Sequence, residues 1–362
     1  MTDVITAATR EDLKEELTLF DVAPADGLQK IMHKAEKIGE KCSDTLIKSV
    51  SLKNMAVYAD GGKFKTRFKG DESDEVFQKF FSDYSFGQLC TKMEVPANYM
   101  YSCVKKGNPE LAEENLNAWI DSYGRSLLIR MYEDRVRGIL SSRYSKFDTP
   151  LVLETLMKCT RGLGLRVKGY FLNEERFHAR LIQQEKMNVN GEDLFAGIQI
   201  DSSDVGRSVL SVNFFIYKQV CTNGLCIAKG AANLFTQRHI NITSDDFYAG
   251  LRASLKCLPE LIAEYAGIIE SCTTSYKLVN GILRPDVDKE LTDAELQKLI
   301  TSVRNKTKLS EEGAQKVIEL SQSKYGLSDW GIINSITEVA QDYTLERRIE
   351  LETIAGGLLK AV

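Results

Sequence analysis

The sequence predicts an α+β fold, with a central, mostly antiparallel sheet flanked by N-terminal and C-terminal helices. Two observations predict it. Apolar residues recur at helical spacing towards both ends of the chain, and paired extended runs separated by short turns fill its middle. We expect a mainly helical region over residues 1–124 with a β-hairpin near 50–69, a basic β-rich core over 125–242 and a helical region over 243–362. The alternative is one continuous domain from about residue 80.

The first elements follow from apolar spacing and turn residues. The stretch LQKIMHKAEKIGEKC has apolar residues at helical spacing and predicts a helix. Asp60-Gly61-Gly62 tolerates positive φ between two extended runs, so it predicts the hairpin. The next stretch, SDEVFQKFFSDYSFGQLCTKMEV, is predicted to be one helix that begins at Ser73 and is stopped by Pro96, with an apolar stripe of Val76, Phe77 and Phe80. A further helix is predicted from Pro109 to Tyr123.

Hairpins and one helix are predicted for the middle of the chain. The turns are Glu133-Asp134, Asn173-Glu174, Asp204-Val205-Gly206 and Asn223-Gly224. The helix begins after Asp148, which has a side chain typical of an N-cap.

Helices are predicted again after Thr243. A Ser-Asp-Asp cap opens a long apolar-periodic run, and Pro259 breaks or kinks it. Capped helices are then predicted in DKELTDAELQKLITSVRNK, SEEGAQKVIELSQSKYG and SDWGIINSITEVAQDY.

The charge distribution is uneven along the chain. Residues 125–241 hold 17 Lys/Arg and 11 Asp/Glu, a net charge of +6, whereas residues 1–124 and 242–362 each carry −5. The overall charge of −4 hides this contrast. A basic middle between two acidic arms is suited to holding a polyanion.

Composition excludes two classes of protein. No run of 18 apolar residues exists and the N-terminus is polar and acidic, so we expect neither a membrane span nor a secretory signal. Eight cysteines are scattered through mostly apolar surroundings, which indicates buried free thiols in a reducing compartment. The expected location is the cytoplasm.

The leading candidate site is a set of cations interleaved with two tyrosines. In a strand, residues two apart share a face, so Arg135 and Arg137 should point the same way and grip phosphates. Tyrosines between them can stack on bases. The alternative is a solvated sheet face that merely discourages aggregation. The set comprises Arg130, Tyr132, Arg135, Arg137, Arg143, Tyr144 and Lys146.

The second candidate is the predicted hairpin strand GGKFKTRFKG. Lys63, Lys65 and Arg67 alternate with aromatic and apolar residues, which is the pattern of a half-buried strand. Such a basic hairpin can also clamp nucleic acid. The acidic run from Asp71 to Glu75 weakens the local positive field.

Metal and catalytic sites are not predicted. Cys221 and Cys226 with His239 lack the spacing and the second ligand pair of a zinc site, and read better as packed thiols beside a turn. Neither His33 nor His178 has a nucleophile or a carboxylate pair at motif spacing. Asp245-Asp246 reads as a helix N-terminus rather than as metal ligands. We therefore expect no cofactor and favour a non-enzymatic function.

Three segments in fixed order resemble a known family. They are FGQLCTKMEVPANYMYSC, LLIRMYEDRVRGILSSRYSKFDTPLVLETL and NFFIYKQVCTNGLCIAKG. Together with the tail WGIINSITEVAQDYTLERRIELETIAGGLL, they are similar to the phage/plasmid-like protein family, domain of unknown function 932. The matching positions are Gln88, Leu89, Val95, Pro96, Tyr99, Arg130, Arg135, Leu140, Ser141, Arg143, Tyr144, Asp148, Cys221, Asn223 and Gly224. Gly138 departs from the pattern, which often has Ala there.

The resemblance covers roughly residues 80–360 and implies a gene of a bacteriophage, plasmid or other mobile element. It implies no activity. Its Arg…Arg…Ser-x-Arg-Tyr strand pair is where we expect a functional residue set, and this pair lies in the basic middle.

Together these features lead to three hypotheses. The first is a non-catalytic protein that binds nucleic acid, preferably single-stranded DNA, in recombination or replication, and that could assemble with copies of itself along the strand. The second is a host-takeover or interaction protein whose acidic helical arms bind a bacterial protein. The third is a structural or virion-associated component.

Overall fold

The structure, a computed structural model, describes residues 27–49, 54–69, 76–218, 223–227, 233–240, 243–272, 276–279, 282–285 and 291–359. Within them it contains helices and two mostly antiparallel sheets, which confirms the predicted α+β class. The helices are α2 (Leu28–Gly39), α3 (Asp83–Lys92), α4 (Ala97–Lys105), α5 (Pro109–Ser122), α6 (Thr149–Thr160), α7 (Ser244–Leu255), α8 (Leu258–Cys272), α9 (Asp293–Thr307), α10 (Glu311–Leu320), α11 (Asp329–Val339) and α12 (Leu345–Leu358). None of these helices is long and apolar enough to cross a membrane.

The first sheet has the strand order β1-β5-β6-β4-β3-β2, and only the β4–β6 pair is parallel. Its strands are β1 (Cys42–Ile47), β2 (Ala56–Asp60), β3 (Lys63–Lys69), β4 (Val76–Phe81), β5 (Leu127–Tyr132) and β6 (Arg135–Ser141). The predicted turn at Asp60-Gly61-Gly62 is confirmed, because Gly61 and Gly62 have φ of 58° and 84°. Strands β5 and β6 come from the basic middle of the sequence and complete a sheet whose other strands lie in the N-terminal region.

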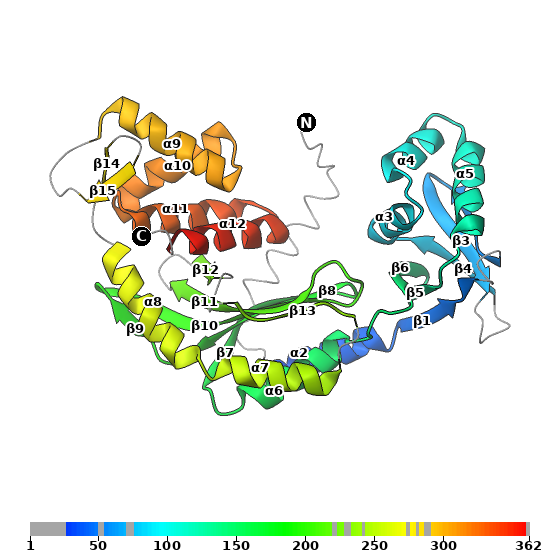
Figure 1. Cartoon of the computed structure of the whole chain (residues 1–362), viewed down its shortest axis with the longest axis horizontal. Helices are drawn as coiled ribbons and strands as arrows, with labels where there is room; N and C mark the ends of the chain where they lie inside the picture. Colours follow the sequence, from blue (N-terminus) through cyan, green and yellow to red (C-terminus); the bar gives the residue numbers. More distant parts are fainter. Residues whose placement is uncertain are drawn as a thin grey trace.

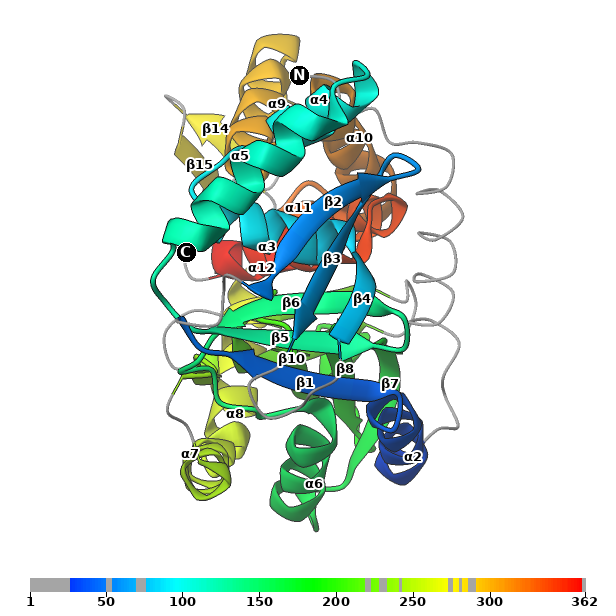
Figure 2. The ribbon, with the colours of Figure 1, turned by 90° about the vertical axis from the view of Figure 1, so that its right-hand side faces the viewer.

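Helices α3, α4 and α5 cover one face of the first sheet. Phe64 and Phe68 of β3 and Phe81 of β4 point into this layer, where they join Phe86 of α3 in one apolar core. Phe64 and Phe86 stack with ring centroids 4.1 Å apart. In Figure 2, β2 and β3 pass in front of α3. The opposite face of the first sheet, here called the open face, carries the alternate residues of each strand.

The second sheet has the order β12-β11-β10-β8-β7, with β13 also pairing with β11 and β9 with β10. Its strands are β7 (Leu165–Leu172), β8 (Arg176–Gln183), β9 (Met187–Val189), β10 (Glu192–Ser203), β11 (Leu210–Lys218), β12 (Asn223–Ile227) and β13 (Asn233–Gln237). Helices α6, α7 and α8 lie on one side of it and α11 and α12 on the other (Figure 1). A separate pair, β14 (Tyr276–Val279) and β15 (Ile282–Pro285), follows α8.

The two sheets lie side by side along the long axis of the molecule (Figure 1). Gln88 of α3 bridges them, because its amide accepts from Ile139 N at 2.9 Å and donates to Val205 O at 2.8 Å. Val205 belongs to the β10–β11 turn of the second sheet.

One predicted helix is wrong in its first half. Residues 76–81 form strand β4, and the helix begins only at Asp83, where the Ser82 side chain accepts from Ser85 N at 3.1 Å. Over so short a run, the apolar stripe of Val76, Phe77 and Phe80 is compatible with the period of a helix and with that of a strand. Pairing with β3 and β6 settles it as a strand, since β-branched and aromatic residues suit a pleated surface.

Three other predicted signals, one turn, one break and one helix start, have clear outcomes in the structure. Asn223 and Gly224 lie inside β12, paired with Lys218 and Tyr217, so the predicted turn at these two residues is wrong. The expected break near Pro259 is confirmed, because α7 ends at Leu255 and α8 begins at Leu258. Asp246 forms a capping box with Thr243, which confirms that Asp245-Asp246 opens a helix.

The edge strand β2 is protected by α5. The Asn117 side chain accepts from Val57 N and donates to Val57 O, both at 2.8 Å, and Glu113 Oε1 accepts from Ala59 N at 2.9 Å. These side chains satisfy backbone groups that a neighbouring strand would otherwise pair with. The first sheet therefore ends at β2.

Candidate nucleic-acid interface

The open face collects the cations of the predicted hairpin. Lys63 and Arg67 are exposed there and Lys65 is half-buried, while the alternating Phe64 and Phe68 are fully covered by the helices. The expected division of β3 into a basic and an apolar face is therefore confirmed. Lys65 also forms an ion pair with Asp60 across the hairpin.

A cross-strand row links this hairpin to the basic middle. The register pairs Tyr58 with Lys65 and Lys65 with Phe80. Phe80 in turn pairs with Arg135, and Arg135 with Tyr132. Because directly paired residues share a face, aromatic and cationic side chains alternate over five adjacent strands. Two motifs that are about 70 positions apart in the sequence thus meet on one surface.

The members of this row are in mutual contact. The Lys65 Nζ lies 4.0 Å from the centre of the Phe80 ring, and the Arg135 guanidinium lies 5.5 Å from that of Tyr132. Lys41, the residue before β1, lies 5.8 Å from the centre of the Tyr132 ring. Arg135 keeps a side-chain exposure of 42%, although Glu174 pairs with it. Its charge therefore remains within reach of a ligand.

Arg130 and Arg137 do not belong to an exposed surface. Each has an exposure of only 1%, so the expectation that they face solvent is wrong. The Arg130 Nε donates to Asp44 Oδ1 at 2.9 Å, and its Nη1 donates to Asp148 Oδ1 at 2.6 Å. Arg137 Nη1 lies 3.6 Å from Asp204 Oδ2 and donates to the Glu174 carbonyl.

The reason for this burial is the second sheet. Its β7–β8 turn brings Glu174, its β10–β11 turn brings Asp204, and α6 begins at Thr149, so this half of the open face is covered. A β-bulge also shifts the register of β5 against β6 between Arg130 and Met131. Arg135 and Arg137 still share a face, as expected, since both contact Glu174. Of the two, only Arg135 reaches solvent.

The buried charges line a cavity of about 300 Å³ between the two sheets. Formal charges balance there, because three cations face three carboxylates: Arg130, Arg137 and Lys146 against Asp44, Asp148 and Asp204. Lys146 Nζ lies 3.1 Å from Asp44 Oδ2 at the rim. A balanced set of this kind joins two sheets and does not attract a polyanion.

Helix α6 is capped by Asp204 and not, as the sequence suggests, by Asp148. Asp148 occupies the N-cap position of α6, but its carboxylate binds Arg130 instead of capping the helix. Asp204 performs the capping, since its Oδ1 accepts from Thr149 N at 3.0 Å and from Thr149 Oγ1 at 2.9 Å. Burial, with Asp148 nearby, raises the pKa of Asp204 to about 6.

Tyr144 is a structural residue. Its hydroxyl donates to the Ser203 and Asp204 carbonyls at 2.9 and 3.0 Å, and its ring stacks on His239 with centroids 5.3 Å apart. The predicted stacking of bases on Tyr144 is therefore replaced by stacking on a histidine. Arg143 lies exposed in the turn after β6, outside the row.

The histidines and cysteines in the described part of the chain form no cluster of metal ligands. No group of three His, Cys, Asp or Glu side chains in the described part of the chain could hold a metal ion. His178 is fully buried in β8, and burial lowers its pKa well below the usual value. His33 is exposed on α2, 3.8 Å from Glu36. Cys221 lies outside the described residues, as does the acidic run from Asp71 to Glu75.

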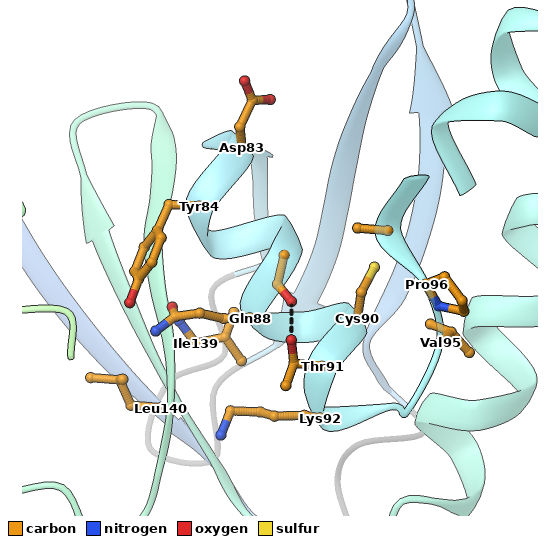
Figure 3. A pocket seen from close by; sticks show the side chains of 12 residues that line it. Asp83, Tyr84, Gln88, Cys90, Thr91, Lys92, Val95, Pro96, Ile139 and Leu140 are labelled. Atoms are coloured by element: carbon orange, nitrogen blue, oxygen red, sulfur yellow. Dashed lines mark hydrogen bonds between the residues drawn. The ribbon is translucent and has the colours of Figure 1, made fainter. Parts of the chain in front are cut away.

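A second hollow, of about 690 Å³, is lined by α3, the start of α4 and β6. Figure 3 shows Tyr84, Gln88 and Leu140 on one side of it and Pro96 on the other. Lys92 is its one lysine or arginine. The hollow therefore lacks the cations of the open face.

Comparison with known proteins places the chain in a family. The family model described as domain of unknown function (DUF932) matches residues 136–356, which is more than half of the chain. The chain belongs to the DUF932 family. Neither the curated proteins nor the solved structures contain a match.

The DUF932 match begins within β6, so Arg135 and the hairpin of β2 and β3 lie outside it. Sequence reasoning missed two members of the row, Tyr58 and Phe80. Alternation of Val76, Gln78 and Phe80 on one face was the available signal for Phe80, but these residues were assigned to a helix.

Proposed function

We propose that this protein binds nucleic acid through the open face of its first sheet, without catalysis, and that it prefers single-stranded DNA. The observation that carries the proposal is the cross-strand row. It places cations for phosphates and rings for bases on one solvent-accessible surface. A role in recombination or replication of a phage or plasmid is the context that the resemblance to phage/plasmid-like proteins favours.

The charge of the open face supports the proposal. Among the described residues, six cationic side chains lie on it or at its rim, and four carboxylates accompany them. The cations are Lys41, Lys63, Lys65, Arg67, Lys69 and Arg135, and the carboxylates are Asp60, Glu133, Asp134 and Glu174. The net formal charge of these residues is about +2 and is local, which reconciles binding of a polyanion with an acidic protein.

The test is a salt-dependent titration. Labelled single-stranded and double-stranded oligonucleotides of equal length are titrated at 50 and 200 mM salt. We expect tighter binding of the single strand, and affinity that falls steeply with salt because counterions are released. Absence of binding at the lower salt concentration, or affinity that is indifferent to salt, would remove the proposal.

A matched pair of variants locates the site. Replacing Lys63, Lys65 and Arg67 with Gln should weaken binding of the single strand and reduce the salt slope by up to about 2.1, roughly 0.7 for each contact. The control replaces Lys298, Arg304 and Lys306 of α9 with Gln, which changes the charge equally far from the open face. Equal loss in both variants would indicate attraction by overall charge and no localised interface.

A second candidate function rests on α5. This helix has four carboxylates and no cation, yet Leu111 and Trp119 are exposed to 47% and 52%. Large exposed apolar residues beside acids suit a basic protein partner, in line with the host-interaction hypothesis. Replacing Trp119 with Ser should then abolish a stoichiometric complex with that partner and leave nucleic-acid affinity unchanged. A complex that survives the substitution would exclude α5 as its site.

A further inference from the structure

The rings of the cross-strand row sit on alternate strands. Tyr58 is on β2, Phe80 on β4 and Tyr132 on β5, and the intervening strands β3 and β6 contribute Lys65 and Arg135. All three rings are half-buried, so each is anchored at one side and reachable at the other.

We infer that a single strand of nucleic acid crosses the sheet at right angles to its strands, with bases stacked on Tyr58, Phe80 and Tyr132 and phosphates at Lys65 and Arg135. This inference rests on the proposed function and specifies its ligand. The recognised features are the flat faces of unpaired bases and the charge between them, so binding is largely independent of sequence.

Strand spacing sets the geometry of the bound strand. Neighbouring strands lie about 4.8 Å apart, so neighbouring rings of the row are about 10 Å apart and the outer two about 19 Å. Bases stacked as in a duplex rise by only about 3.4 Å. Bases on two neighbouring rings are therefore not stacked on each other. A duplex, whose bases face inward, cannot offer them to the rings at all.

The row has two ends, which limit the length of the site. At one end β2 is the edge strand, and Asn117 and Glu113 of α5 occupy its free backbone groups. Beyond Tyr132 the register continues only to Cys42 of β1, while Arg137 is buried. A row of about 19 Å accommodates about four to six nucleotides per chain.

The cations already rest on the rings. Lys65 lies over Phe80 and Arg135 near Tyr132, where cation–π attraction holds them without a ligand. A base that stacks on Phe80 takes the place of the Lys65 ammonium group, which is flexible enough to turn towards a phosphate. Binding thus replaces the contact between cation and ring with a contact between base and ring, and no ring is left exposed.

The test separates stacking from charge. Fluorescence anisotropy is measured with thymidine oligonucleotides of two to twenty nucleotides, and with abasic phosphodiester strands of the same length and charge. We expect the thymidine strands to bind at least about 10-fold more tightly, since stacking on each ring contributes a factor of about 5 to 100. Affinity should rise steeply up to about six nucleotides and only slowly thereafter.

Variants assign the effect to the rings. The Phe80→Leu and Tyr132→Leu double variant, which keeps apolar side chains, should lower thymidine affinity towards the abasic level without changing abasic affinity, and only the contribution of Tyr58 should remain. The Tyr99→Leu variant is the control, because Tyr99 is an exposed tyrosine on α4. Circular dichroism and thermal unfolding verify that each variant is folded.

The outcomes are distinct. Equal affinity for thymidine and abasic strands would overturn the stacking inference and leave a backbone-binding function in place. Failure of both strands to bind at low salt would instead remove the proposed function itself. Loss of binding in the Tyr99 variant, with none in the ring variant, would place the bases elsewhere.

Discussion

Arg130 of β5 and Asp148, at the N-cap of α6, are joined by two parallel hydrogen bonds, of which the one between Nη1 and Oδ1 measures 2.6 Å. The same guanidinium group donates to Asp44 of β1 and to the Asp204 carbonyl at 2.5 Å. One buried cation therefore joins the first sheet to α6 and to the β10–β11 turn. Together with the Gln88 bridge, it holds the two sheets against each other.

Replacing Arg130 with Ala should lower the free energy of unfolding by roughly 3–5 kcal/mol. The change leaves Asp44 and Asp148 facing a cavity without their cation, and a broken buried ion pair costs this much. Urea unfolding measures the effect. Arg143→Ala is the control, because Arg143 is exposed and its loss should cost less than about 0.5 kcal/mol. A loss below about 1 kcal/mol for Arg130→Ala would mean that water solvates the two carboxylates.

Acid stability should depend on His239. Burial lowers its pKa to about 4, from about 6.5 in an unfolded chain, so the unfolded state binds more protons between these pH values. The folded protein therefore loses stability as the pH falls through this window, by up to about 3 kcal/mol. His239→Phe keeps a ring against Tyr144 and removes the titration. The variant should lose less stability than the wild type between pH 7 and 4.5.

Asp204 should affect acid stability in the direction opposite to His239. Its pKa of about 6 lies above the ordinary value of 3.8, so the folded state holds the proton more tightly than the unfolded chain. Its contribution to stability is present below about pH 4 and is lost as the pH rises through 6. Asp204→Asn keeps an acceptor for Thr149 N and should lose more stability than the wild type on acidification. If the stability of both variants and of the wild type changed with pH in the same way, the pKa shifts of His239 and Asp204 would both be contradicted.

A side chain at position 138 should destabilise the protein. A Cβ at this position would lie 3.0 Å from the Val205 Cβ and Cγ1, at the contact between the two sheets. Gly138→Ala should therefore cost roughly 1–3 kcal/mol through overpacking. Adding Val205→Ala removes the obstacle, so a double-mutant cycle should show a favourable coupling between the two substitutions. Additive effects would show that the Val205 turn moves freely.

Removing Glu174 should strengthen binding of nucleic acid. Its carboxylate pairs with Arg135 and so competes with a phosphate for that cation. Glu174→Gln should raise affinity by a factor of about 2 to 10 at low salt and steepen the salt dependence by up to about 0.7. Glu133→Gln, which frees Lys41 beside Tyr132, provides a comparison at the end of the row. Unchanged affinity in Glu174→Gln would show that Arg135 does not contact the ligand.

Local signals in the sequence determined most of the elements. The hairpin at Gly61-Gly62, the capping box at Thr243 and the alternation of Lys63, Lys65 and Arg67 each depend on neighbouring residues only. Such features are set by backbone preference and by side-chain period, which a linear sequence displays. The class of the fold and the basic face of β3 follow from them.

Tertiary structure decided which cations remain available. Arg130, Arg135 and Arg137 look alike in the sequence, but only Arg135 keeps solvent contact, because the turns at Glu174 and Asp204 cover the others. Strand β4 likewise became a strand only by inserting between β3 and β6. Burial and long-range pairing depend on segments far apart in the chain, so no local pattern of charge or hydropathy could reveal them.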